Sequence, residues 1–118
     1  MGSISGNSAN ANYSFKSGDD EIALEVERSK TEILLHLLVK DLSQYDYVAI
    51  ERSPETPDNF AKCKYISGSD TLSRGSYMLE VDRYPYAACK NVYYRIKTVT
   101  RDGIERAYPA VFLPASKK

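Results

Sequence analysis

The stretch NVYYRIKTVTRDGIERAYPAVFL, residues 91–113, decides the fold because it predicts two β-strands folded back on each other. Its first half alternates, so successive side chains point to opposite faces of a sheet. One face is expected to enter the core, and it carries Tyr94, Ile96 and Thr98. The other face carries Tyr93, Arg95, Lys97 and Val99.

A tight turn joins the two halves of this stretch. Asp102-Gly103 is a strong hairpin signal, because glycine adopts a positive φ without steric cost. Residues 104–113 are expected to return as the partner strand. Pro109 lies inside that strand and marks an edge or a bulge, since proline has no amide hydrogen to give to a ladder.

Composition and charge narrow the class of protein. The 118 residues suffice for one domain, and the 10 tyrosines favour an all-β fold. Lys and Arg total 16 and Asp and Glu total 16, so no net field attracts nucleic acid or an anionic membrane surface. No apolar run is long enough to span a membrane. No charged and then apolar leader opens the chain, so an exported form is expected to have lost its signal peptide.

Five further strands are expected before the hairpin, at residues 21–28, 32–40, 47–53, 60–67 and 76–82. Alternate positions of these strands are predicted to face the core, among them Ile22, Leu24, Val26, Ile33, Leu35, Leu37, Val39, Val48, Ile50, Tyr77, Leu79 and Val81. In the fourth strand, one face is predicted to carry Cys63 and Tyr65 and the other Lys62 and Lys64. Seven short strands separated by turn clusters are typical of an immunoglobulin-like β-sandwich.

The sandwich is expected to span residues 19–114. Residues 1–18 are expected to form a flexible arm, because the opening run of Gly, Ser, Asn and Ala cannot bury enough surface to offset its ordering entropy. Residues 115–118 are expected to be a short tail.

Several motifs together resemble a fibronectin type III-like module of secreted bacterial proteins. They are residues 47–53 (YVAIERS), Phe60, residues 93–97 (YYRIK), the turn at 102–103 and Tyr108. The family has the run aromatic-x-Ile-Glu-Arg-Ser, then a Phe, Tyr-Tyr-Arg-Leu-Lys and an Asp-Gly turn before a Tyr. Such modules are often found ahead of a C-terminal sorting domain of the type IX secretion route. The resemblance covers residues 21–113, with Leu37 in place of the usual tryptophan.

The resemblance implies a strand order and places several residues. Strands one, two and five form one sheet, and strands four, three, six and seven form the other. Tyr94 takes the tyrosine-corner position, with its hydroxyl bonded to the backbone of the preceding loop. This order also brings the turn before Cys63 and the loop holding Cys89 to the same end. A Cys63–Cys89 disulfide is therefore one alternative, and a buried Cys63 thiol is the other.

Few side chains form a pattern that points to chemistry. His36 is the sole histidine and has no spaced Cys, His or carboxylate partner, so a structural role is expected. Residues 19–21 (DDE) are interpreted as a solvated turn rather than half of a calcium site. Residues 101–103 (RDG) are interpreted as turn geometry rather than as an integrin motif. No nucleophile–base pair or ligand cluster is visible, so neither enzyme activity nor a cofactor is expected.

The outer face of the larger sheet is the candidate binding face. It is expected to carry Tyr47, Glu51, Lys62, Lys64, Tyr93, Arg95 and Lys97. Aromatic rings beside charged groups can stack on a sugar or meet a protein. The alternative is a polar sheet face laced by cross-strand pairs, such as Glu51 with Arg95 or Lys97.

The expected function is that of a non-catalytic module of an exported bacterial protein, located outside the cell, at the cell surface or in the periplasm. It would act as a spacer, or contact neighbouring domains of a larger chain or another cell-surface protein. The alternative is a carbohydrate-binding module that uses tyrosines of the outer face. A nucleic-acid partner is not expected.

Overall fold

The computed structural model describes residues 14–29, 32–69, 77–83 and 90–115. Its strands are β2 (Ser14–Gly18), β3 (Ile22–Ser29), β4 (Glu32–Val39), β5 (Tyr45–Pro54), β6 (Ala61–Ser67), β7 (Tyr77–Asp82), β8 (Val92–Thr100), β9 (Glu105–Ala107) and β10 (Val111–Leu113). A turn of 3-10 helix, η1 (Leu42–Gln44), precedes β5. Within these residues no helix is long and apolar enough to cross a membrane.

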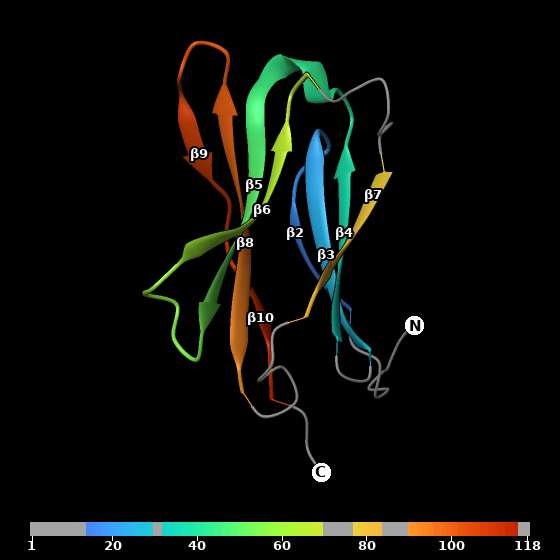
Figure 1. Ribbon diagram of the computed structural model, residues 1–118, viewed down its shortest axis with the longest axis vertical. Helices are drawn as coiled ribbons and strands as arrows, with labels where there is room; N and C mark the ends of the chain where they lie inside the picture. Colours follow the sequence, from blue (N-terminus) through green and yellow to red (C-terminus); the bar gives the residue numbers. More distant parts are fainter. Residues whose placement is uncertain (1–13, 30–31, 70–76, 84–89, 116–118) are drawn as a thin grey trace.

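The strands form two antiparallel sheets that pack face to face as a sandwich (Figure 1). The five-stranded sheet has the order β10-β8-β5-β6, with β9 also paired to β8, and the four-stranded sheet has the order β2-β3-β4-β7. The all-β sandwich is therefore confirmed. The expected grouping of strands is also observed, since β3, β4 and β7 share one sheet and β5, β6 and β8 share the other.

Two boundaries differ from the prediction of seven strands with a free arm. Ser14–Gly18 is a strand that pairs with β3, so the expected arm at 1–18 is wrong for its last five residues. The last strand is split around Pro109, because a residue without an amide hydrogen interrupts the ladder. The Ser17 hydroxyl donates to the Pro109 carbonyl oxygen at 2.6 Å, which ties β2 to this break.

The predicted hairpin turn is present between β8 and β9. Gly103 has a φ of 88°, the left-handed conformation that glycine was expected to supply. Its amide donates to the Thr100 carbonyl oxygen at 2.9 Å, and the Thr100 amide donates to the Ile104 carbonyl oxygen at 2.9 Å. The tip of the hairpin is therefore closed by backbone hydrogen bonds.

Alternate residues of both sheets fill one core. The largest side chains with almost no exposure are Tyr94, Ile22, Leu24, Ile33, Leu35, Leu37, Ile50, Ile66 and Ile96. All the inward positions predicted for β3, β4, β5 and β8 are buried, so these predictions are confirmed. Burial of these side chains is the main stabilising contribution, at about 1.5–3 kcal/mol for each large aliphatic residue.

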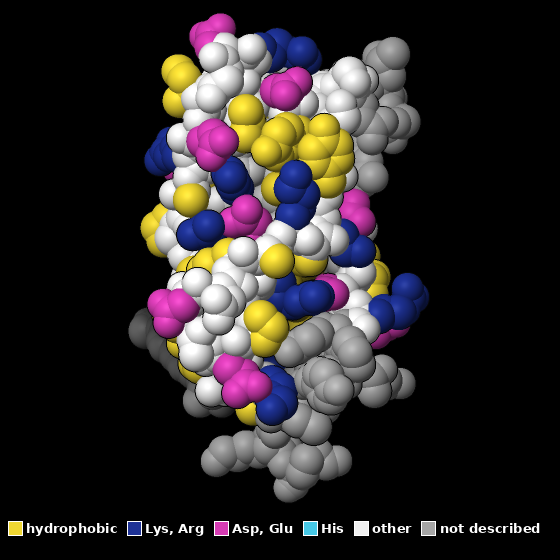
Figure 2. All heavy atoms as spheres, turned by 60° about the vertical axis from the view of Figure 1, so that its left-hand side comes forward, with side chains coloured by type: hydrophobic (Ala, Val, Ile, Leu, Met, Phe, Trp, Pro, Cys, Tyr) yellow, Lys and Arg dark blue, Asp and Glu magenta, His cyan; other side chains and the backbone are white. Residues whose placement is uncertain are grey.

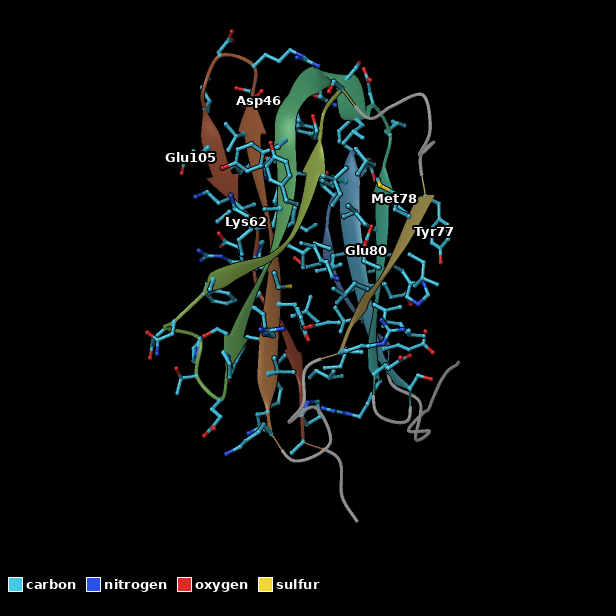
Figure 3. The ribbon with its side chains drawn as sticks, in the orientation of Figure 1. Asp46, Lys62, Tyr77, Met78, Glu80 and Glu105 are labelled. Carbon is cyan, nitrogen blue, oxygen red and sulfur yellow. The ribbon has the colours of Figure 1, made fainter. Side chains whose placement is uncertain are left out.

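The register of β7 is opposite to the prediction. Tyr77 and Leu79 were expected in the core but are 50% and 49% exposed, whereas Met78 and Asp82 are 4% and 6% exposed. Figure 3 shows Tyr77 pointing away from the sandwich and Met78 lying on its inner side. A shift of one residue exchanges the two faces of a strand. The observed register is favoured because it lets Asp82 accept hydrogen bonds from Arg52 and Tyr94 between the two sheets.

The alternation predicted for β6 is also wrong, because a bulge interrupts it. Ile50 of β5 pairs with Lys64 and Glu51 pairs with Lys62, so Cys63 is the extra residue. Cys63 packs against the core, whereas Tyr65 is 55% exposed. These two side chains therefore do not share a face.

Candidate functional site

The predicted binding face lies on the outer side of the five-stranded sheet. Figure 2 shows basic, acidic and hydrophobic side chains interspersed there. Register places six of the predicted residues on this face: Tyr47, Glu51, Lys62, Tyr93, Arg95 and Lys97. Lys64 is the exception, because it pairs opposite the core residue Ile50 and so lies on the inner side.

Internal contacts occupy this face. Arg95 Nε donates to Glu51 Oε1 at 2.7 Å, and Lys97 Nζ lies 3.1 Å from Glu105 Oε1. The Glu51–Arg95 pair is one that the sequence predicted. Glu51 is only 7% exposed although it points outward, which means that its neighbours cover it.

The aromatic residues of the face are likewise in contact with one another. The rings of Tyr47 and Tyr65 lie 4.9 Å apart between centroids. The ammonium nitrogen of Lys62 lies 4.8 Å from the Tyr47 ring centroid and 5.2 Å from that of Tyr65. Cation–π contacts of this kind place Lys62 over the ring faces on which a sugar would stack.

The loop after β5 covers the other end of the same face. The Ser53 hydroxyl donates to the Thr56 carbonyl oxygen and accepts from the Asn59 amide at 2.9 Å, and Ser53 is fully buried. The Phe60 ring lies 4.2 Å from the Arg95 guanidinium carbon. This face is therefore better described as a polar sheet face, whose side chains contact one another, than as an open aromatic surface.

A polar cluster inside the sandwich joins the two sheets. Arg52 Nη1 of β5 donates to both oxygens of Asp82 of β7, at 2.7 and 2.8 Å. The hydroxyl of Tyr94 of β8 donates to Asp82 Oδ2 at 2.6 Å. Tyr94 is fully buried, as predicted, and its hydroxyl has a carboxylate partner. Most of the preceding loop, whose backbone was the expected partner, lies outside the described residues. Burial and the Asp82 hydrogen bond raise the pKa of Tyr94, so the hydroxyl keeps its proton.

Cys63 lies close to this cluster. Its thiol is free, and burial raises its pKa to about 12, well above the ordinary value of 9.0. The neutral thiol behaves as a small buried hydrophobic group. Cys89, the other member of the predicted disulfide, lies outside the described residues.

Alkaline solution should destabilise the protein through Cys63. The folded state favours the neutral thiol, so this contribution is complete below about pH 9 and is lost as the pH rises through about 12. We expect Cys63→Ser to make the fall of unfolding free energy with pH shallower, by up to about 1.4 kcal/mol per pH unit. Urea unfolding at several pH values from neutral to about pH 11 measures this slope. Identical slopes in the two proteins would contradict a titrating buried thiol.

The acidic turn between β2 and β3 has a structural role. Asp19 Oδ1 accepts hydrogen bonds from the amides of Glu21 and Ile22 at 2.9 and 3.1 Å, which lowers the pKa of Asp19. Its other oxygen lies 3.6 Å from Arg106. These contacts support the interpretation of residues 19–21 as a turn.

An open pocket of about 470 Å³ lies beside that turn, lined by Lys16, Asp19, Asp20, Glu21, Ile22, Ala23, Leu38, Val39 and Lys40. Two lysines line it together with three acidic residues, so it offers no uniformly anionic site for a cation. Among the described residues no group of three or more potential metal ligands comes together.

The outer face of the four-stranded sheet is the surface that the sequence analysis missed. Leu38 is 42% exposed and pairs directly opposite Tyr77, and Leu79 pairs opposite His36. The His36 ring stacks on the Tyr77 ring at 6.0 Å, and His36 Nδ1 lies 2.7 Å from the Tyr77 hydroxyl oxygen. We call Leu38, Tyr77 and Leu79 the apolar patch.

One signal in the sequence pointed to this patch. The run at residues 32–39 is apolar on both faces, although an outward face of a sandwich is ordinarily polar. The outward position of Tyr77 and Leu79 had no such signal, because the alternation of their strand favours the opposite register. No family model, curated protein or solved structure matches this chain.

Proposed function

We propose that this chain is a non-catalytic, fibronectin type III-like module of an exported bacterial protein, acting as a protein-contact domain or a spacer outside the cytoplasm. The family resemblance of residues 21–113 motivates this proposal. The grouping of β3, β4 and β7 in one sheet and β5, β6 and β8 in the other supports it.

The observation that carries the contact role is the apolar patch. Its three side chains are each 42–50% exposed and come from two adjacent strands. Tyr77 is held in one orientation by His36, so little side-chain entropy would be lost when a partner covers it. Tyrosine is one of the residue types that most often contribute the binding energy of protein interfaces.

The alternative is carbohydrate binding by the five-stranded sheet. Tyr65, 55% exposed and in contact with Tyr47, is the observation that favours it. Lys62 weighs against it, because its ammonium group lies over both rings.

Site-specific photo-cross-linking in the full-length protein, on cells that make it, tests the contact role. A photoreactive residue is placed at position 79 or, as the matched control, at position 65, which is exposed to a similar degree on the opposite face. We expect adducts from position 79, with mass spectrometry identifying either another domain of the same chain or a second protein. Adducts from position 65 alone would contradict the proposed face, and adducts from neither would leave only the spacer role.

A glycan array separates the carbohydrate alternative from this proposal. Saturable binding that is lost in both Tyr47→Ala and Tyr65→Ala would establish the alternative. We expect no glycan to bind in this way.

A further inference from the structure

Three hydrogen-bonded side chains cross the four-stranded sheet diagonally on its outer face. His36 Nε2 lies 2.8 Å from Glu27 Oε1, and His36 Nδ1 lies 2.7 Å from the Tyr77 hydroxyl oxygen. An ionised carboxylate only accepts hydrogen bonds, so the hydrogen between His36 and Glu27 is on Nε2. In the neutral imidazole, Nδ1 then carries a lone pair, and the Tyr77 hydroxyl donates to it.

This is the order of groups that activates a side-chain hydroxyl: a nucleophile, a base within hydrogen-bond distance, and a third group that orients the base. The His36 side chain is 20% exposed, and it is held by Glu27 on one side and by the Tyr77 ring on the other. Tyr77 itself is 50% exposed. The base is therefore fixed, and the nucleophile lies at the surface.

The neighbours of Tyr77 offer a place for an apolar group. Leu38 and Leu79 flank the Tyr77–His36 pair and are 42% and 49% exposed. The face is an open sheet surface, so solvent would stabilise any developing oxyanion. A substrate must therefore bring a good leaving group of its own.

We propose that Tyr77 is a base-activated nucleophile that accepts an acyl group from an activated aryl ester. Tyr77 Oη attacks the ester carbonyl carbon while His36 Nδ1 takes the hydroxyl proton, and Glu27 stabilises the imidazolium. The bond from the carbonyl carbon to the aryl oxygen breaks, and the leaving phenolate takes the electron pair and then the proton. The products are O-acyl-tyrosine and the phenol. The step occurs once per chain, and it requires no contact partner.

The test measures acetylation of individual tyrosines by p-nitrophenyl acetate. The whole chain is treated with the ester, and peptide mass spectrometry follows acetylation of Tyr77 and Tyr65 over time. Tyr65 is the matched control within the same molecule, because it is 55% exposed and contacts Tyr47 and Lys62 instead of a histidine.

We expect Tyr77 to be acetylated about tenfold faster than Tyr65. This is a small effect compared with the hundredfold or more that a general base contributes in a closed active site. Equal rates at the two tyrosines in the unmodified sequence would overturn the proposal, whatever any variant does.

The variant His36→Gln separates base activation from simple accessibility. Glutamine keeps a polar side chain at this position but has no basic nitrogen. We expect the Tyr77 rate to fall to that of Tyr65, with an unchanged near-ultraviolet circular dichroism spectrum as evidence of folding. A folded variant in which Tyr77 reacts at its original rate would contradict the role of His36.

Discussion

Replacing Asp82 with alanine is expected to lower the free energy of unfolding by about 3–5 kcal/mol, the cost of removing one partner of a buried ion pair. The Asp82 side chain is 8% exposed and accepts hydrogen bonds from both Arg52 and Tyr94. Its removal takes away the carboxylate that accepts hydrogen bonds from the Arg52 guanidinium and from the buried Tyr94 hydroxyl, in the space between the two sheets. Urea unfolding, with the slope checked for two-state behaviour, measures the change.

Two further variants make this expectation specific. Tyr94→Phe should cost about 1.5 kcal/mol, because it removes one hydrogen bond to a charged group and leaves the Arg52–Asp82 pair in place. Asp20→Ala, an exposed aspartate on a turn, should change stability by no more than about 0.5 kcal/mol. A loss at Asp82 as small as that at Asp20 would mean that the cluster does not hold the sheets together.

Arg95→Ala is expected to lower the free energy of unfolding by about 2–3 kcal/mol, because it leaves the nearly buried Glu51 carboxylate without its cation. The figure is below that for Asp82 because the Arg95–Glu51 contact is a single hydrogen-bonded pair, whereas Asp82 accepts hydrogen bonds from two side chains, Arg52 and Tyr94. The same substitution also removes the contact of the guanidinium with the Phe60 ring.

Lys97→Ala is the matched control, two residues along the same strand and on the same face. Its partner Glu105 is 61% exposed, so this variant should lose clearly less stability than Arg95→Ala. Thermal or urea unfolding of both variants compares them directly. Equal losses would show that burial of Glu51 does not distinguish the two pairs.

Sequence patterns predicted most of the fold because they act over short distances. The alternation in β3, β4, β5 and β8 and the Asp-Gly turn are local, and each is observed. The errors arise where a distant partner decides the outcome. In β7 the more apolar face, with Tyr77, Leu79 and Val81, points outward. The opposite face points inward because Asp82 then contacts Arg52 and Tyr94.

On the candidate surfaces too, contacts set by local pattern were predictable and contacts set by distant partners were not. The Glu51–Arg95 pair was predictable, because cross-strand neighbours follow from strand pairing. The bulge at Cys63 was not, since Lys62 and Tyr65 reach Tyr47 only after one extra residue is inserted in β6. The diagonal chain from Glu27 through His36 to Tyr77 depends on three strands and on the register of β7.

The apolar patch, the activated Tyr77 and the Asp82 cluster all depend on the register of β7. Nuclear Overhauser effects from the Leu79 methyl groups test it most directly in solution. We predict contacts between these methyl groups and the His36 ring, together with contacts between the Met78 methyl group and Leu37 in the core. Contacts of the Leu79 methyl groups with Leu37 or Ile50 instead would place Leu79 in the core and contradict all three inferences.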